Sequence, residues 1–262
     1  MNPTIIGALR IRNEARWIRR VIRSIAPVCN RIIVLDDNSE DDTGNICLAE
    51  GCAVFRNAVP WVDTENGTVS DETAGKQFLL QTVFDGIPAE EEHWLAGNHR
   101  SPYWMLAIDG DEELVEQDQQ LILDAVKHPE VHAWAPQIQY LWDRPDQWRV
   151  DGVYGNFRRP SLFRVMNLEF TYMKTPWGNG ANFHCSSIPQ ELIGHSRPLD
   201  ARLLHWGYMA QADRLRKFDW YNRVDPGNQA EDCYRHMVQG DVPEIPPDAK
   251  LRHAGPLVLR PL

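Results

Sequence analysis

The sequence lacks a long apolar run. Nowhere in its 262 residues is there an uninterrupted stretch of about 18 to 20 apolar residues, the length that a membrane-spanning helix needs. The N-terminus also lacks the basic segment and long apolar stretch of a secretory signal. These absences predict a cytoplasmic protein with no membrane span.

Paired cysteines and an excess of positive charge are lacking as well. The five cysteines form no CxxC pair, which favours reduced thiols over disulfides or a zinc site. Lys and Arg total 27 against 37 Asp and Glu, giving a formal net charge of −10. Because the phosphates of nucleic acids bind to clustered positive charge, this balance argues against long nucleic-acid contacts.

What the first half does contain is an alternation of strand and helix patterns. Strands are predicted at residues 4–9, 31–35, 52–55 and 103–108, and helices at 13–26, 43–50 and 73–84. Strands separated by helices indicate an α/β fold with a mostly parallel, doubly wound sheet. We therefore assign residues 1–130 to an α/β half.

After residue 130 the pattern loosens, because tryptophan, proline and glycine become frequent. We predict a mixed, loop-rich lobe over residues 131–262, forming one compact unit with the first half. Its elements are predicted as short strands at 161–165 and 201–204, a helix at 211–224 and an irregular tail from Asp241.

Three predicted strands of the first half end in polar clusters. These are Arg12-Asn13-Glu14, Asp36-Asp37 and Asp109-Gly110-Asp111. In parallel sheets, ligands bind beyond the carboxyl ends of the strands. Two carboxylates at one strand end can both reach a hard cation such as Mg²⁺ or Mn²⁺. The alternative is an acidic turn that caps a helix beginning near Leu114.

The order and spacing of these stretches resemble those of the family 2 glycosyltransferases, which have the GT-A fold. The matching segments are residues 8–14, 32–43 and 105–112, and a later match at 204–208 is followed by Arg214, Lys217 and Tyr221. The resemblance implies metal-dependent transfer of a sugar from a nucleotide-sugar donor, a UDP-sugar above all. The acceptor would be a saccharide or another molecule with a hydroxyl group, and a modified DNA base is not excluded.

The resemblance also implies roles for individual residues. Arg12, Asn13 and Glu14 would lie beside the nucleotide, Asp36 and Asp37 would contact the base or ribose, Lys76 would face the donor, Asp109 would approach the ribose or the metal, and Asp111 and His205 would bind a Mn²⁺ or Mg²⁺ ion.

Simpler roles remain open for the same residues. Asp37 could cap a helix, Lys76 could be a solvated charge, and His205 could be structural. The run of residues 213–217 is predicted to be a solvated helix face, with one or two cations turned toward phosphate. Since a loop carboxylate contributes little to core packing, we expect removal of the Asp111 charge to leave the fold intact.

The catalytic base is the weakest part of the resemblance. Many relatives carry a His-Glu pair before the late histidine, whereas the corresponding pair here, His184-Cys185, lacks the acid. An inverting enzyme needs a carboxylate to deprotonate the acceptor. The candidates are Asp143, Asp146, Asp151 and Glu191, and a retaining reaction without a base stays open. Sugar rings could stack on Trp142, Trp148, Tyr154, Trp177 or Trp206, or these side chains could belong to the core.

Competing functions fit the sequence less well. An aspartate-nucleophile phosphatase also has a strand followed by Asp-x-Asp, but Glu113 stands where such enzymes carry Thr or Val. A calcium loop at residues 36–42 is excluded because its sixth position is Asp41 instead of glycine. A nucleotidyltransferase would need a glycine-rich basic loop after the first strand, which is absent. A noncatalytic relative that binds nucleotide-sugars remains an alternative.

Overall fold

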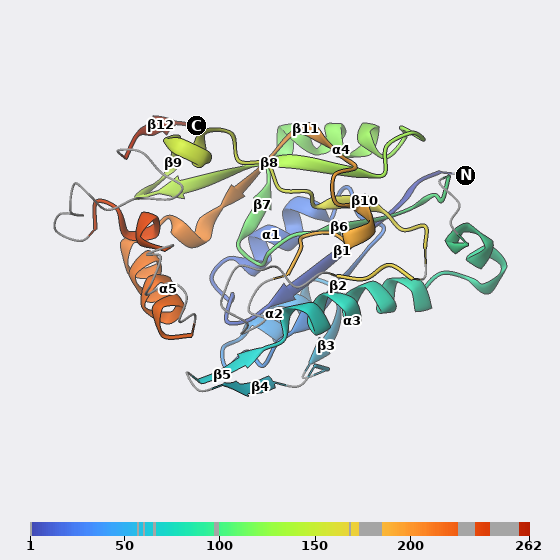
Figure 1. The fold of residues 1–262 in the computed structure, drawn as a ribbon, viewed down its shortest axis with the longest axis horizontal. Coiled ribbons are helices and arrows are strands. Elements are labelled where there is room, and N and C mark those ends of the chain that lie inside the picture. The colour runs from blue at the N-terminus through green and yellow to red at the C-terminus, as the bar shows by residue number, and fades with distance from the viewer. Residues whose placement is uncertain are drawn as a thin grey trace.

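The computed structural model describes residues 2–56, 58–59, 61–64, 67–96, 100–167, 169–172, 185–224, 234–241 and 257–262. A large sheet forms the centre of the molecule, and α5 lies at the end opposite the N-terminus (Figure 1). Side chains alternate along β1, so that Ile5 and Leu9 join one apolar core while Ile6 and Ala8 join a second. The sheet is therefore buried on both faces.

The first half of the chain forms the parallel part of this sheet. Its strands are β1 (Thr4–Ile11), β2 (Arg31–Asp36), β3 (Ala53–Arg56) and β6 (Tyr103–Ala107), in the order β6-β1-β2-β3. Helices α1 (Ile18–Ile25) and α2 (Thr43–Ala49) contribute to the first core, and α3 (Glu72–Asp85) contributes to the second. The strands β4 (Trp61–Thr64) and β5 (Gly67–Ser70) form a separate hairpin.

The second half extends the same sheet with mixed pairing. Its strands are β8 (Ala133–Trp142), β9 (Arg144–Arg149), β10 (Leu162–Arg164), β11 (Ser196–His205) and β12 (Leu259–Pro261), and the short strand β7 (Glu112–Leu114) of the first half joins them. The antiparallel strand β10 joins β6 to β8, and β11 runs parallel to β8 and antiparallel to β7. The mixed α/β class predicted from the sequence is confirmed; the boundary near residue 130 stays a prediction.

The short helix α4 (Gln119–Ala125) ends the first half, and the second half contains the longer helix α5 (Gln211–Val224). Short 3₁₀ helices connect other elements: η1 (Ala89–Leu95), η2 (Glu116–Asp118), η3 (Gly152–Asn156), η4 (Gln190–Leu192), η5 (Trp206–Tyr208) and η6 (Arg235–Val238). Within the described ranges, no helix is long and apolar enough to cross a membrane.

Several predicted boundaries need correction. The first helix begins at Ile18 instead of residue 13, because the backbone N–H groups of Asn13 and Glu14 donate to the side chains of Ser39 and Thr43. No helix follows Asp111 near residue 114, where β7 pairs with β11. The long strands β8 and β9 were not predicted, and the tail contains β12, which pairs with β9.

Candidate functional site

A cavity of about 520 Å³ opens at the carboxyl ends of β1 and β6. Cationic and acidic groups reach it from four elements or loops: Arg10, Glu72, Lys76, Asp109 and Arg159. Much of the remaining wall is aromatic, formed by Tyr140, Phe157, Tyr172, Tyr208, Tyr221 and Tyr234. The cavity thus combines groups that bind anions with aromatic faces that suit sugar rings.

The loop after β6 presses against the end of β1. A Cβ on Gly110 would lie 2.8 Å from Ile11 Cγ2 and 2.9 Å from Glu14 Cγ, so only glycine fits there without movement. This contact brings the Asp109–Asp111 loop beside Glu14, as the ends of neighbouring parallel strands should be. Because β7 follows this loop, the alternative of a helix-capping turn is wrong.

Asp111 is buried and ion-paired. Its Oδ2 lies 2.9 Å from Lys217 Nζ, and its Oδ1 lies 3.9 Å from His205 Nε2. Burial alone would raise the pKa of Asp111, but His205 and the Lys217 ammonium lower it overall. Because burial lowers the pKa of His205 to about 4, its ring is neutral near pH 7, and Lys217 is the cation that stabilises the carboxylate there. A Cβ on Gly207 would overlap both Asp111 Oδ2 and Lys217 Nζ, so the glycine makes this ion pair possible. The expectation that Asp111 contributes little to packing therefore needs correction.

Asp109 belongs to a second ion-pair cluster. Arg159 Nη1 lies 2.7 Å from Asp109 Oδ2, and the same guanidinium pairs with the buried carboxylate of Glu112. The backbone N–H of Asp109 donates to Glu112 Oε2 at 3.0 Å. Burial raises the pKa of Glu112 to about 7, even though Arg159 opposes the shift. Asp109 remains half-exposed at the cavity wall, with its pKa lowered by Arg159 against the effect of desolvation.

The donor set for a divalent cation can be tested on these distances. The separation of 3.9 Å between Asp111 Oδ1 and His205 Nε2 is about 1 Å longer than that of neighbouring ligands in an octahedral site with metal–ligand distances of about 2.0–2.2 Å, so the two side chains would have to move closer to bind one ion. Gly207 N–H donates a hydrogen bond of 3.2 Å to His205 Nδ1, so a neutral ring carries its proton on Nε2. To bind a metal through Nε2, the ring would have to carry that proton on Nδ1 and lose this hydrogen bond. Among the described residues, no three His, Cys, Asp or Glu side chains converge as a metal cluster. Asp111 and His205 thus offer one oxygen and one nitrogen ligand of the kinds that Mn²⁺ or Mg²⁺ accepts, once the two side chains approach and the hydrogen bond to Nδ1 is lost, and the other positions would go to substrate or water.

Glu14 adds a further carboxyl group to this crowded region. Desolvation, and next to it the charge of Asp111, raises the pKa of Glu14 to about 8. Since the pKa is raised on folding, the folded state binds a proton more tightly than the unfolded state does. The contribution of Glu14 to stability is thus fully present below about pH 4.5 and is lost as the pH rises through about 8.

We expect Glu14→Gln, which mimics the protonated carboxyl, to raise the melting temperature at pH 8.5 relative to wild type by about 2 °C or more, and to change it little at pH 5. Melting curves in chelator across this range measure the difference. Glu40→Gln is the matched control, because the side chain of Glu40 is 82% exposed on the adjoining loop. Parallel wild-type and Glu14→Gln curves would contradict the assignment.

The carboxyl end of β2 reaches the cavity through β1. Asp37 Oδ2 lies 2.6 Å from Arg10 Nη2, and Arg10 lines the cavity. A Cβ on Gly75 would lie 2.7 Å from Arg10 Cδ, so α3 approaches closely enough to hold this arginine in place. Asp37 does not cap the following helix, whose N-cap is Asp42. Asp36 points elsewhere, toward Arg56 at 3.4 Å and the N–H of Ser39.

The remaining donor-side candidates lie in and beside the cavity. Lys76 is largely buried and pairs with Glu72 at 2.9 Å, so it is not a solvated helix charge. Glu72 also accepts a hydrogen bond from Cys185 N. Arg12 and Asn13 occupy the loop between β1 and α1, where Arg12 lies 3.4 Å from Glu40 and Asn13 has a φ of 54°.

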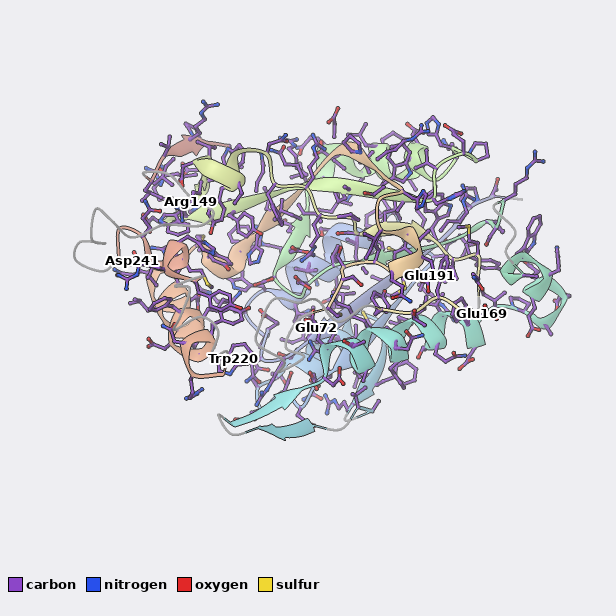
Figure 2. The ribbon with its side chains drawn as sticks, in the orientation of Figure 1. Glu72, Arg149, Glu169, Glu191, Trp220 and Asp241 are labelled. Carbon is purple, nitrogen blue, oxygen red and sulfur yellow. The ribbon has the colours of Figure 1, made fainter. Side chains whose placement is uncertain are left out.

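The structure does not bring the proposed base candidates into the cavity wall. Asp151 is buried with both carboxylate oxygens on Arg149, and Asp143 accepts from Arg214 at 2.7 Å. Glu191 accepts from Thr171, and in Figure 2 it lies on the other side of Glu72 from Arg149. The exposed Asp146 pairs with Arg144. Each candidate has a structural partner away from the cavity.

The aromatic candidates Trp142 and Trp206 are buried. Trp142 is buried between the guanidinium groups of Arg149 and Arg214, and Trp206 stacks on Trp17. Trp177 and His184 lie outside the described residues. None of the cavity tyrosines was among the candidates for stacking on sugar rings, although Tyr208 and Tyr221 belong to the later match with the family. Tyr140 stacks on the ring of His205 at 4.9 Å, and Tyr208 contacts the same ring edge-on.

Comparison with known proteins gives distant similarities. The sequence matches no family model. Proteins of Mycobacterium tuberculosis and Mycobacterium bovis, each described as uncharacterized, are 26% identical over 243 residues, covering 85% of this chain and 51% of their own length. The chain thus spans about half the length of these curated relatives.

Two solved structures overlap most of the chain. Glucosyl-3-phosphoglycerate synthase from M. tuberculosis, in complex with Mn²⁺, UDP and glucosyl-3-phosphoglycerate, is 14% identical with a TM-score of 0.44, covering 85% of this chain and 80% of that one. A mycobacterial protein is 16% identical with a TM-score of 0.44, covering 85% and 75%.

Proposed function

We propose that this protein is a glycosyltransferase that moves a sugar from a nucleotide-sugar donor, a UDP-sugar above all, to an acceptor hydroxyl. The observation that carries the proposal is the meeting of three strand ends at one cavity. Arg10 of β1 and Asp109, which follows β6, line it, and Asp37, which follows β2, contacts the cavity through its ion pair with Arg10. Asp111 follows Asp109 by two residues on the same loop. The resemblance of the same stretches to family 2 glycosyltransferases supports this interpretation.

The cations of the cavity suit a diphosphate. Arg10, Lys76 and Arg159 all line it. The charge of Asp109 and that of Glu112 raise the pKa of Arg159 against the effect of burial, so its guanidinium stays charged. Arginine forks bind phosphate oxygens through paired hydrogen bonds. These side chains would hold and orient the donor, while the tyrosine rings would exclude water from the sugar.

Asp111 and His205 are the residues we propose for a Mn²⁺ or Mg²⁺ ion. When bound, such an ion would offset the negative charge that grows on the diphosphate as the glycosidic bond breaks. We assign no general base, because Glu72 and Asp109, the carboxylates of the cavity wall as described, each hold a cation. That pairing suits binding better than proton abstraction.

A panel of UDP-, GDP-, ADP- and dTDP-sugars tests the proposal. With Mn²⁺ or Mg²⁺ present, we expect nucleoside diphosphate to be released from at least one donor, UDP-sugars first, and release to fall in chelator. Absence of both binding and release for every donor would overturn the proposal. Donor binding without turnover would favour the noncatalytic alternative, and release of inorganic phosphate from phosphomonoesters would favour the phosphatase.

We further expect Asp37→Ala to weaken UDP binding about tenfold even in chelator, which corresponds to about 1.4 kcal/mol. The motive is the Arg10–Asp37 pair, which lies apart from the proposed metal ligands. Isothermal titration with UDP measures the change. Asp42→Ala, which removes an exposed carboxylate on the same loop, is the control, and equal affinity in Asp37→Ala and wild type would refute the role.

A further inference from the structure

Lys217 is the cation nearest to the carboxylate that the proposed metal would use. It reaches Asp111 from α5, and its ammonium lies 2.9 Å from Oδ2 in a largely buried ion pair. The space around this pair is filled, because any side chain at Gly207 would overlap both partners. An ion pair exposed on the surface would not require a glycine beside it.

A divalent cation and the Lys217 ammonium would repel each other if both bound to the carboxylate of Asp111. The cation would bind on the Oδ1 side, facing His205, while the ammonium stays on Oδ2 of the same small carboxylate. Two positive charges would then lie a few ångströms apart in a buried site, where repulsion is weakly screened. A metal ion and Lys217 would therefore compete for Asp111.

We propose that Lys217 is a built-in counter-ion of Asp111, which occupies the carboxylate in the resting protein and is displaced when a divalent cation binds together with the donor diphosphate. This inference rests on the proposed function. It predicts that the metal alone binds weakly, and that the diphosphate strengthens metal binding by accepting the displaced ammonium.

The helix allows this exchange without moving as a whole. Arg214, three residues earlier on α5, is fully buried and anchors the helix through Asp143 and Asp241. Tyr221, four residues after Lys217, lines the cavity, and residues four apart share a helix face. The flexible lysine stem can therefore swing its ammonium along the cavity side of a fixed helix.

The first test is Mn²⁺ binding without nucleotide, measured by calorimetry on wild type and Lys217→Met. We expect Lys217→Met to bind Mn²⁺ at least about tenfold more tightly, because the repelling charge is gone. We also expect it to bind UDP in the presence of Mn²⁺ more weakly than wild type does. Arg216→Met is the matched control: it removes the same charge from the adjacent position, where the side chain is 66% exposed, and should change Mn²⁺ affinity less than twofold.

A second measurement uses the wild type alone, so that the inference can be tested even if Lys217→Met does not fold. Acylation of Lys217 by a small reagent, followed by peptide mass spectrometry, should increase when saturating Mn²⁺ is added. Equal Mn²⁺ affinity in Lys217→Met and wild type, or unchanged acylation, would overturn the counter-ion role and leave the proposed sugar transfer standing. Donor turnover that needs no metal, with no Mn²⁺ binding by either protein, would also overturn this role alone. Absence of donor binding in all variants would overturn both proposals.

Discussion

Asp111→Asn is expected to lower the rate of sugar transfer at least about a hundredfold, which corresponds to about 2.7 kcal/mol in the activation free energy. The carboxylate is the proposed metal ligand, and the metal would act mainly on the transition state, where charge on the diphosphate is greatest. Donor turnover at saturating Mn²⁺ measures the loss. Near-normal turnover would refute the assignment of Asp111 to the metal site.

The same substitution should also cost stability, contrary to the expectation from the sequence. Asp111→Asn would leave the Lys217 ammonium without its carboxylate in a buried site, and an uncompensated buried charge is strongly destabilising. We expect the double variant Asp111→Asn with Lys217→Met to recover part of the melting temperature in chelator while remaining inactive. Asp146→Asn is the control, since that carboxylate is 62% exposed and pairs with Arg144. This set separates lost chemistry from lost folding.

The parts of the site that lie at strand ends could be predicted from the sequence. The apolar runs that form β1, β2 and β6 each stop at a polar cluster, and parallel pairing then fixes where those clusters meet. The α/β class follows from the same alternation. The approach of His205 to Asp111 was implied by the resemblance to a family, not by the spacing of the two residues.

The wall of the cavity could not be predicted in this way. Arg159 and Tyr140 reach it from the second half of the chain, where β8 is buried on both faces and shows no alternating pattern. Glu72 lies in the first turn of α3, where acidic residues are common because they interact favourably with the helix dipole. Its position in the sequence therefore does not indicate a binding site. Contacts between such distant segments depend on tertiary packing, which local sequence patterns do not predict.

A signal against two of the base candidates was nevertheless present. Arg149 and Asp151, like Arg144 and Asp146, are two residues apart, and in extended backbone such side chains point to the same face. Opposite charges at this spacing indicate a local ion pair. The pattern therefore indicates structural roles for Asp146 and Asp151.

The sequence also shows no sign that Arg214 of α5 is buried. The run of residues 213–217 was predicted to be a solvated face, yet Arg214 is fully buried. Its guanidinium pairs with Asp241 at 2.6 Å and Asp143 at 2.7 Å, and it donates to the carbonyl groups of Tyr208 and Met209. Arg214 thus ties α5 to η5, to the turn between β8 and β9, and to the segment after η6.

Arg214→Met is therefore expected to lower the free energy of unfolding by about 3–5 kcal/mol, because two carboxylates and two carbonyl groups lose a buried partner that an apolar side chain cannot replace. The melting temperature in chelator should fall by on the order of 10 °C. Arg216→Met is the matched control, and because its side chain is 66% exposed we expect a change within about 0.5 kcal/mol. Thermal and urea unfolding of both variants measure the difference. If Arg214→Met unfolded at the same midpoint as Arg216→Met, the network around Arg214 would contribute no more to stability than an ordinary surface ion pair.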